Sequence, residues 1–152
     1  MDPALEVPMP DWQSLSSRSP YRTAVAIREQ LQQGHVQEAM GGIEELVEAM
    51  SRSEERALKS QLVRLMLHII KWRTQPEYRS LSWVANIKDA REEIADIQEE
   101  TPSLTDQIIQ EMWDKCLRIA KRDAQAEMNR TTPIQDLSWE EVFKADYELD
   151  DS

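Results

Sequence analysis

The sequence predicts an all-α protein, an antiparallel helical bundle of about four main helices followed by a short C-terminal helix. Glycine occurs only three times among the 152 residues, and the frequent Glu, Gln, Leu, Ala and Arg favour helix. Apolar residues recur in steps of three and four positions rather than alternating, so strands are not expected. Prolines stand at the ends of the periodic segments, where they stop helices.

The chain is long enough for one domain with its own hydrophobic core. We expect an extended N-terminal tail at residues 1–18, a helical bundle at residues 19–130 and an acidic C-terminal segment with a short helix at residues 131–152. Three prolines and little periodicity predict the tail, in which Trp12 is suited to pin the chain.

The first helix is expected at residues 20–33. Ser19 followed by Pro20 is typical of an N-cap and the first helical position. Gly34 is typical of a residue that follows a helix C-terminus.

The second segment leaves two alternatives open. Gly41 and Gly42 each cost up to about 1 kcal/mol relative to Ala in a helix interior, so we expect the confident helix to begin near them. Ser51 and Glu54 match a capping box, which predicts a break near residue 51. The alternative is one helix over residues 43–74, which the absence of Gly and Pro there favours.

The later helices each show an apolar stripe and a start or stop signal. Pro76 ends the central helix, and Ser80 or Ser82 is expected to cap the next one. Thr101 or Ser103 is expected to cap the helix after that, which runs to about Asn129. The three stripes are Leu58, Leu62, Leu65, Ile69 and Trp72; then Trp83, Ile87, Ala90, Ile94 and Ile97; then Leu104, Ile108, Met112, Cys116 and Ile119.

The last residues combine negative charge with one helix signal. Ser138 and Glu141 form a second capping box, which predicts a short terminal helix. The net charge of the chain is −11, which argues against non-specific binding to nucleic acid or membranes. Residues 52–92 nevertheless carry nine basic and five acidic side chains between two acidic flanks. We expect the flanks to fold back and neutralise this basic segment.

A reducing compartment fits the cysteine content, because Cys116 is the only cysteine. The longest apolar run, LMLHII, is too short to span a bilayer. The N-terminal MDPALEVPMPDW lacks the basic and apolar regions of a secretory signal. A cytoplasmic location without membrane attachment is therefore expected.

Residues 68–83, HIIKWRTQPEYRSLSW, hold the densest group of unusual residues and allow two interpretations. In the first, Trp72, Pro76, Ser82 and Trp83 form a structural corner between two helices, with the two indoles packed together. Arg79 would then hold the turn by bonding to Glu77 or to the last carbonyls of the central helix.

In the second interpretation the same region binds a partner. Arginine with aromatic residues anchors protein partners and also stacks on single-stranded nucleic acid, although the net acidity opposes nucleic acid. We favour the corner, with partner binding second. The candidate partner-binding residues are Arg64, His68, Lys71, Arg73, Tyr78 and Arg79.

Several segments make the chain resemble the DUF29 family over about residues 21 to 125. They are IEELVEAM, SEERALKSQL, LMLHIIKWRTQPEYRSLSW and the PSL at 102–104. The family pattern usually has Asp and Asn-Leu before the paired glutamates, where this chain reads AMGGIEE. The resemblance implies a small all-helical bacterial domain, common in cyanobacteria, with no established activity. It implies no catalytic residue.

Catalytic or metal chemistry has little support in the residue patterns. His68 could act with Glu44 or Glu48 as a metal site or in a metal-dependent hydrolase, but the paired Glu-x-x-His motifs of bundle metal sites are missing. We interpret His68 as a histidine bonded at the edge of the core, and Cys116 as a small apolar residue. No cofactor, metal or catalytic residue is expected.

The sequence thus predicts a non-enzymatic helical interaction domain that binds a protein partner through the turn at 71–83 or associates with itself. The alternatives are a nucleic-acid-associated or antitoxin-like regulatory module and the hydrolase centred on His68.

Overall fold

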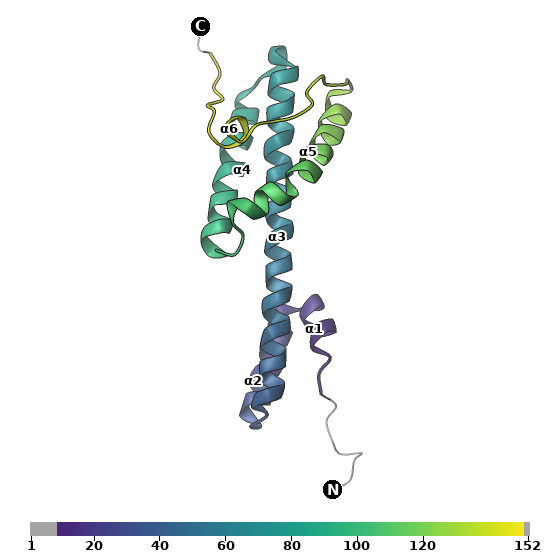
Figure 1. The fold of residues 1–152 in the computed structure, drawn as a ribbon, viewed down its shortest axis with the longest axis vertical. Helices are drawn as coiled ribbons and strands as arrows, with labels where there is room; N and C mark the ends of the chain where they lie inside the picture. The colour runs from purple at the N-terminus through teal and green to yellow at the C-terminus, as the bar shows by residue number, and fades with distance from the viewer. Residues whose placement is uncertain (1–8, 151–152) are drawn as a thin grey trace. The chain divides into compact units, whose positions relative to one another are not determined.

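The computed structural model describes residues 9–150 and is all-α, as the sequence predicts (Figure 1). Its helices are α1 (Trp12–Arg18), α2 (Pro20–Gln32), α3 (Val36–Thr74), α4 (Leu81–Glu100), α5 (Asp106–Met128) and α6 (Trp139–Phe143). One turn of 3-10 helix, Pro76–Tyr78, stands between α3 and α4. The four main helices expected are α2 to α5, and α6 is the short C-terminal helix.

Two compact units divide the chain after residue 53, within α3. The first unit contains α1, α2 and the beginning of α3. The second contains the rest of α3 together with α4, α5, α6 and the C-terminal segment. The segments expected from the sequence had no boundary at this position.

The tail expected at residues 1–18 is wrong for its second half, because Trp12–Arg18 forms α1. Asp11 caps this helix: its Oδ1 accepts a bond from the Ser14 N–H at 3.3 Å. Trp12 is buried and packs in a small cluster with Ile27 and Ala39. A cap and one buried indole are enough to stabilise a two-turn helix that propensity alone would leave unformed. The first eight residues of the expected tail lie outside the described range.

The signals expected around α2 are confirmed. The Ser19 side chain accepts from the Arg22 N–H at 3.1 Å, and Pro20 occupies the first turn. Gly34 has a φ of +80°, the left-handed conformation that favours glycine. The His35 N–H bonds the Gln30 carbonyl at 2.8 Å, which closes the helix and turns the chain into α3.

A single helix, α3, runs from Val36 to Thr74, so the long-helix alternative is confirmed and no break occurs at Ser51. The helix begins seven residues before the predicted start at 43. The glycines do not delay it, because Gly42 lies where α2 and Trp12 approach most closely. A Cβ at Gly42 would be 2.7 Å from Ile27 Cγ1 and 3.0 Å from the Trp12 ring. Glycine at position 42 lowers the helix propensity of α3, but it allows this close packing against Ile27 and Trp12.

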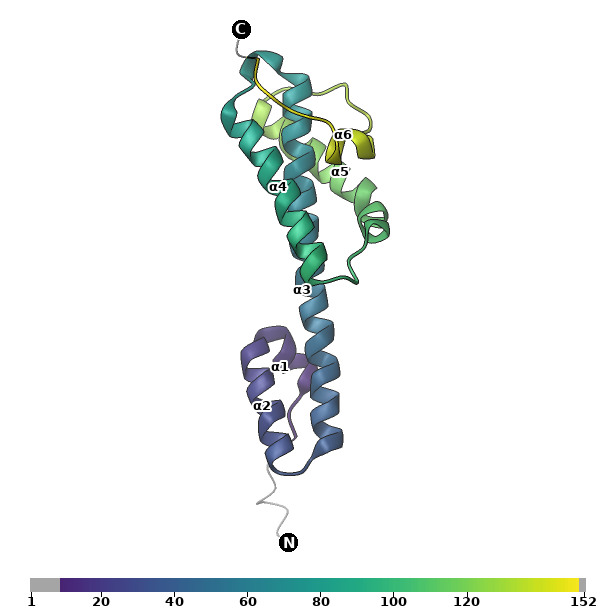
Figure 2. The ribbon, with the colours of Figure 1, turned by 90° about the vertical axis from the view of Figure 1, so that its left-hand side faces the viewer.

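Most residues of the predicted stripes lie in the core of the second unit. Leu58, Leu62, Leu65 and Ile69 on α3 are fully buried, and Trp72 is 6% exposed. Ile87, Ala90, Ile94 and Ile97 of α4 and Cys116 of α5 join the same cluster. Figure 2 shows α4 running alongside the later part of α3. Four stripe members are half-buried rather than fully buried: Trp83, Ile108, Met112 and Ile119.

Of the two predicted caps, the Ser80 alternative for α4 is confirmed and the cap of α5 is wrong. Ser80, not Ser82, caps α4, and its side chain accepts from the Trp83 N–H at 3.3 Å. Ser82 lies inside the first turn, where its carbonyl accepts from the Asn86 amide at 2.9 Å. The helix α5 follows Thr105 rather than Thr101 or Ser103, and Thr105 makes no side-chain cap bond. It ends at Met128 as predicted, because Asn129 adopts a left-handed φ of 52°.

The C-terminal segment belongs to the core of the second unit. Ile134, Leu137 and Val142 are buried in the same cluster as the α3 stripe. The predicted capping box is present: Ser138 Oγ accepts from the Glu141 N–H, and Glu141 accepts from the Ser138 N–H, both at 3.1 Å.

Candidate functional site

The turn at residues 71–83 is held together by its own side chains. Trp72 is buried, and the Arg79 guanidinium lies 4.6 Å from the centre of its ring. Arg79 Nε also donates to the Trp72 carbonyl at 2.9 Å, so the arginine bonds the C-terminal end of α3 after Pro76 stops the helix. This bond is the one that the structural interpretation expects of Arg79.

The two indoles of the turn do not stack on each other. Trp72 meets Tyr147 edge-on, with ring centres 5.8 Å apart. Trp83 is half-buried, and Lys71 Nζ lies 5.1 Å above its ring. Among the aromatic contacts of residues 9–150 there is no pairing of Trp72 with Trp83, so that expectation is wrong. Tyr147 thus packs against Trp72 in the position that was expected for Trp83.

The basic side chains of the candidate partner-binding set bond within the chain. Arg64 pairs with Asp89 at 2.6 Å and donates to Asn86 at 3.1 Å. Lys71 Nζ is 3.9 Å from a Glu127 carboxylate oxygen. These acidic partners come from α4 and α5. Asp89 belongs to the basic segment itself, whereas Glu127 belongs to the C-terminal acidic flank, which therefore folds back on that segment.

His68 lies beside the core on α3. Its Nδ1 is 2.8 Å from the Arg64 carbonyl, one helical turn earlier, so this nitrogen carries the donated proton. Burial lowers the pKa of His68 from its ordinary value, and the charges of Lys71 and Arg64 lower it further, although the carbonyl bond opposes them. A neutral ring anchored to its own helix is a structural arrangement.

The described residues, 9–150, offer neither a metal-binding group nor an exposed thiol. No group of three or more His, Cys, Asp or Glu side chains in residues 9–150 is arranged to hold a metal ion. Glu44 and Glu48 are exposed on the early part of α3, in the other unit from His68. Cys116 is buried, and burial raises the pKa of its thiol, which opposes formation of the reactive thiolate.

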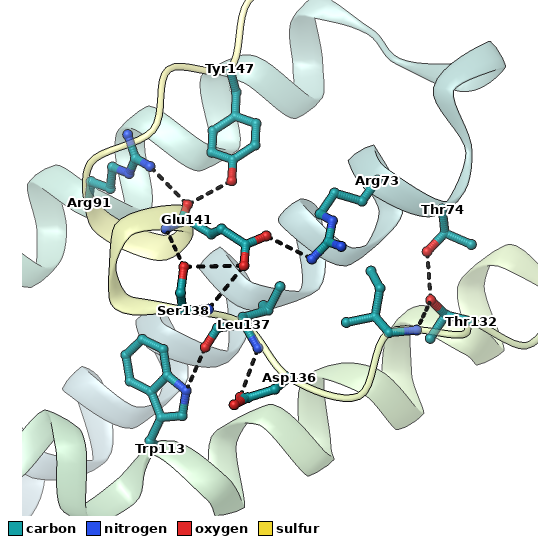
Figure 3. A network of polar contacts seen from close by, with 11 residues as sticks. Arg73, Thr74, Arg91, Trp113, Thr132, Asp136, Leu137, Ser138, Glu141 and Tyr147 are labelled. Atoms are coloured by element: carbon teal, nitrogen blue, oxygen red, sulfur yellow. Dashed lines mark hydrogen bonds and ion pairs between the residues drawn. The ribbon is translucent and has the colours of Figure 1, made fainter.

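A network that sequence reasoning missed fixes the C-terminal segment to the helices (Figure 3). Its centre is Glu141, whose carboxylate is 2.7 Å from Arg73 Nη1. The backbone carbonyl of Glu141 accepts from the Tyr147 hydroxyl at 2.7 Å and from Arg91 at 3.3 Å. Arg91 Nε donates to the Val142 carbonyl at 2.9 Å. These bonds pair the exposed carbonyl end of a five-residue helix with one arginine and one phenol.

Burial raises the pKa of Tyr147, and the neighbouring Glu141 raises it further. The hydroxyl therefore keeps its proton and remains a donor. Only the Ser138–Glu141 capping box was visible in the sequence. Arg73 and Arg91 are 68 and 50 residues away from Glu141, and Tyr147 follows it by six residues, a spacing that matches no capping pattern.

Aromatic stacking holds the other side of this segment. Trp113 of α5 and Trp139 of α6 stack with ring centres 5.6 Å apart, and Trp139 lies 4.4 Å from Phe143. Trp113 Nε1 donates to the Leu137 carbonyl at 3.2 Å. The acidic C-terminal segment is thus an integral layer of the second unit.

Within residues 9–150, large apolar side chains remain exposed at two places. On the turn, Tyr78 is 63% exposed and Leu81 is 74% exposed. The others all belong to the first unit, where they lie on α2 and on early α3, apart from Met9, which precedes α1. Exposed apolar groups are therefore a chemically available feature of both units.

The fold and the turn define a class: a small all-helical domain whose polar turn is internally bonded and whose exposed groups are apolar. Within residues 9–150 no helix is long and apolar enough to cross a membrane. The chain belongs to the DUF29 family, whose model, described as a domain of unknown function, matches residues 24–150. This match confirms the resemblance and extends it through the C-terminal network. No curated protein and no solved structure matches the chain.

Proposed function

We propose that the chain is a non-enzymatic interaction domain that binds a protein partner through the turn at 71–83. The observation that carries this proposal is the contrast within the turn. Its arginines and lysine bond within the chain, whereas Tyr78 and Leu81 leave most of their surface in water. The partner is therefore expected to offer an apolar pocket rather than an acidic patch.

The geometry of the turn supports such a contact. Tyr78 ends the 3-10 turn and Leu81 begins α4, so the two side chains stand three residues apart on a short, internally bonded segment. The Tyr78 N–H bonds the Gln75 carbonyl at 3.0 Å, and Arg79 is fixed to Trp72. A tyrosine and a leucine on a pre-organised turn lose little conformational entropy on binding.

Two observations support the non-enzymatic part. The thiol of Cys116 is buried and its pKa is raised, and the His68 ring is bonded to its own helix. A nucleic-acid partner has less support, because Arg64, Lys71 and Arg73 already have acidic partners. Phosphate contacts would have to replace those pairs.

A photocrosslinking pull-down tests the proposal. A photoreactive phenylalanine analogue at position 78 of the tagged chain, expressed in its native host, is expected to trap a specific protein. A Tyr78→Ser/Leu81→Ser variant of the tagged chain should lose that protein in an ordinary pull-down. Glu77→Ala is the matched control, since this exposed neighbour pairs with Arg130 at 3.5 Å and lies outside the apolar pair.

Equal capture by the serine variant and the wild type would contradict the proposal. A mobility shift with single-stranded oligonucleotide at low salt would instead favour the nucleic-acid alternative.

A further inference from the structure

The early part of α3 carries an apolar stripe that the described chain leaves exposed. Its members follow one another in steps of four, three, four and three residues, which is the a/d pattern of helices that pack side by side. Their exposed fractions lie between 39% and 61%. They are Val36, Met40, Ile43, Val47 and Met50.

One flank of α3 is covered by α1 and the other is open. Gly42 faces α2, since a Cβ there would lie 2.7 Å from Ile27. Successive residues turn by about 100° around a helix, so Gly41 and Ile43 lie on opposite flanks of Gly42. Gly41 faces Trp12, whose ring would be 3.7 Å from a Cβ at that position. The stripe, centred on Ile43 and Val47, therefore lies on the flank that Trp12 does not cover.

The open flank continues onto α2. Figure 2 shows α2 running antiparallel beside the first part of α3. In two antiparallel helices, residues that are rotated in the same sense from the contact line, each about its own helix axis, lie on the same side of the pair. Ile43 is rotated in this way from Gly42, and Leu31 and Tyr21 are rotated in the same sense from Ile27. Leu31 and Tyr21 therefore lie on the same side as the stripe. Leu31 is 48% exposed and Tyr21 is 79% exposed.

We propose that this hairpin face, the α3 stripe together with Tyr21 and Leu31, binds a second copy of the chain. Two hairpins placed face to face form an antiparallel four-helix bundle, the standard way to bury one open side of a helix pair. A two-fold axis parallel to the helices places α2 of each copy against α3 of the other. Because rotation about this axis does not move residues along it, each residue keeps its height along the helices.

The levels of the side chains fit this arrangement. Because Ile27 is level with Gly42, Leu31 lies near the level of Val36 and Met40, and Tyr21 near that of Val47 and Met50. Apolar groups would therefore meet apolar groups at both ends of the face.

Charge also fits between these ends. Arg28 of α2 lies on the same face, near the level at which Glu44 edges the α3 stripe. Residues 9–150 provide no ion pair for either side chain. The two-fold operation brings Arg28 of one copy toward Glu44 of the other, twice per dimer.

The buried area is sufficient for a specific dimer. With about half of each of seven large side chains exposed, the face presents on the order of 600 Å² of apolar surface, at the upper end of the largest patches found on typical monomers. Two such faces bury roughly 1,200 Å², the lower end of the range for stable interfaces. We take a reversible dimer with a micromolar Kd as the expected case, because interfaces at the small end of this range are often weak.

Sedimentation equilibrium of the full chain tests the assignment. The wild type is measured between about 1 and 100 µM, a range of two decades around the expected Kd. Its average mass should rise from 17.7 kDa toward twice that value as the concentration increases. Ile43→Glu/Val47→Glu should weaken the dimer at least about a hundredfold, since it places four carboxylates in the seam. Both residues are exposed, so its helical circular dichroism should match the wild type. Tyr78→Ser/Leu81→Ser should dimerise normally, which separates this result from the partner proposed for the turn.

A charge exchange adds a readout that general destabilisation would not give. Arg28→Glu alone should weaken the dimer about tenfold, and adding Glu44→Arg in the same chain should restore most of it. A wild type that stays monomeric at the highest concentration overturns the proposal. So does a dimer whose Kd the Ile43→Glu/Val47→Glu variant leaves unchanged, or a charge exchange without recovery.

Discussion

Replacing Gly42 by alanine should destabilise the first unit, although alanine is the better helix former. The gain in propensity is about 0.5–1 kcal/mol. Against it, the new Cβ would meet Ile27 Cγ1 at 2.7 Å and two Trp12 ring atoms at 3.0 Å. Overpacking of this kind costs about 1–3 kcal/mol, because the ring and the neighbouring helix must move apart. The difference between cost and gain spans about 0–2.5 kcal/mol, and we expect a net loss in the middle of that range, about 0.5–2 kcal/mol.

Gly41→Ala is the matched control. Its Cβ would lie 3.7 Å from Trp12 Cδ1, an ordinary van der Waals distance, so the propensity gain should dominate. Neighbouring glycines in one helix are thus expected to respond to the same substitution with opposite signs.

Hydrogen exchange measured by mass spectrometry gives the local readout. Amides of α2 and early α3 should exchange about two- to thirtyfold faster in Gly42→Ala and about two- to fivefold slower in Gly41→Ala, since 1.4 kcal/mol is tenfold. Amides of α5, in the other unit, serve as the internal reference. If Gly42→Ala protects α2, or both variants change exchange in the same direction, the close packing inferred at Gly42 is wrong.

Three further outcomes are expected in the second unit. Trp72→Ala should lower the free energy of unfolding by about 3–5 kcal/mol in a urea titration, because it removes a buried indole and the ring beneath Arg79. Tyr147→Phe should cost about 0.5–1.5 kcal/mol in the same titration, because it removes the 2.7 Å bond to the Glu141 carbonyl. His68→Gln should reduce the acid-dependent loss in the free energy of unfolding. Because the pKa of His68 is lower in the folded state, the unfolded state binds the proton first as the pH falls below 6.5. The wild type therefore loses stability as the pH falls from 6.5 through the folded pKa, and the glutamine variant lacks this loss.

Each of these has a clear contrary result. A cost below about 1 kcal/mol for Trp72→Ala would mean that the ring is not a core group. An unchanged midpoint for Tyr147→Phe would mean that the hydroxyl bonds water instead of the helix end. Parallel stability curves for wild type and His68→Gln between pH 7 and 5 would contradict the lowered pKa.

Local signals in the sequence were enough to place most helices. Ser19-Pro20, Gly34 and the Ser138–Glu141 box each act within one turn of backbone, so they require no tertiary contact to be recognised. The stripes on α3 and α4 identified core residues because a helix with an apolar face is stable only when that face is buried. Pro76 marked the turn for the same local reason.

Residues whose role depends on a distant partner could not be predicted in this way. Tyr147, not Trp83, meets Trp72, and Arg91 bonds the end of α6 from 50 and 51 residues away. The sequence likewise identified the basic residues around the turn but not their acidic partners. Such contacts depend on how the helices pack, and sequence spacing does not encode that.

What the sequence determined by itself was helix content, helix ends and inward faces, because these follow from steric and hydrogen-bonding preferences within a few residues. The tertiary structure decided which charges are neutralised, which ring covers Trp72, and why α3 continues through Gly41 and Gly42. It also showed that the apolar side of early α3 remains in water. Burial is set by what lies opposite a side chain, and that is a property of the folded chain alone.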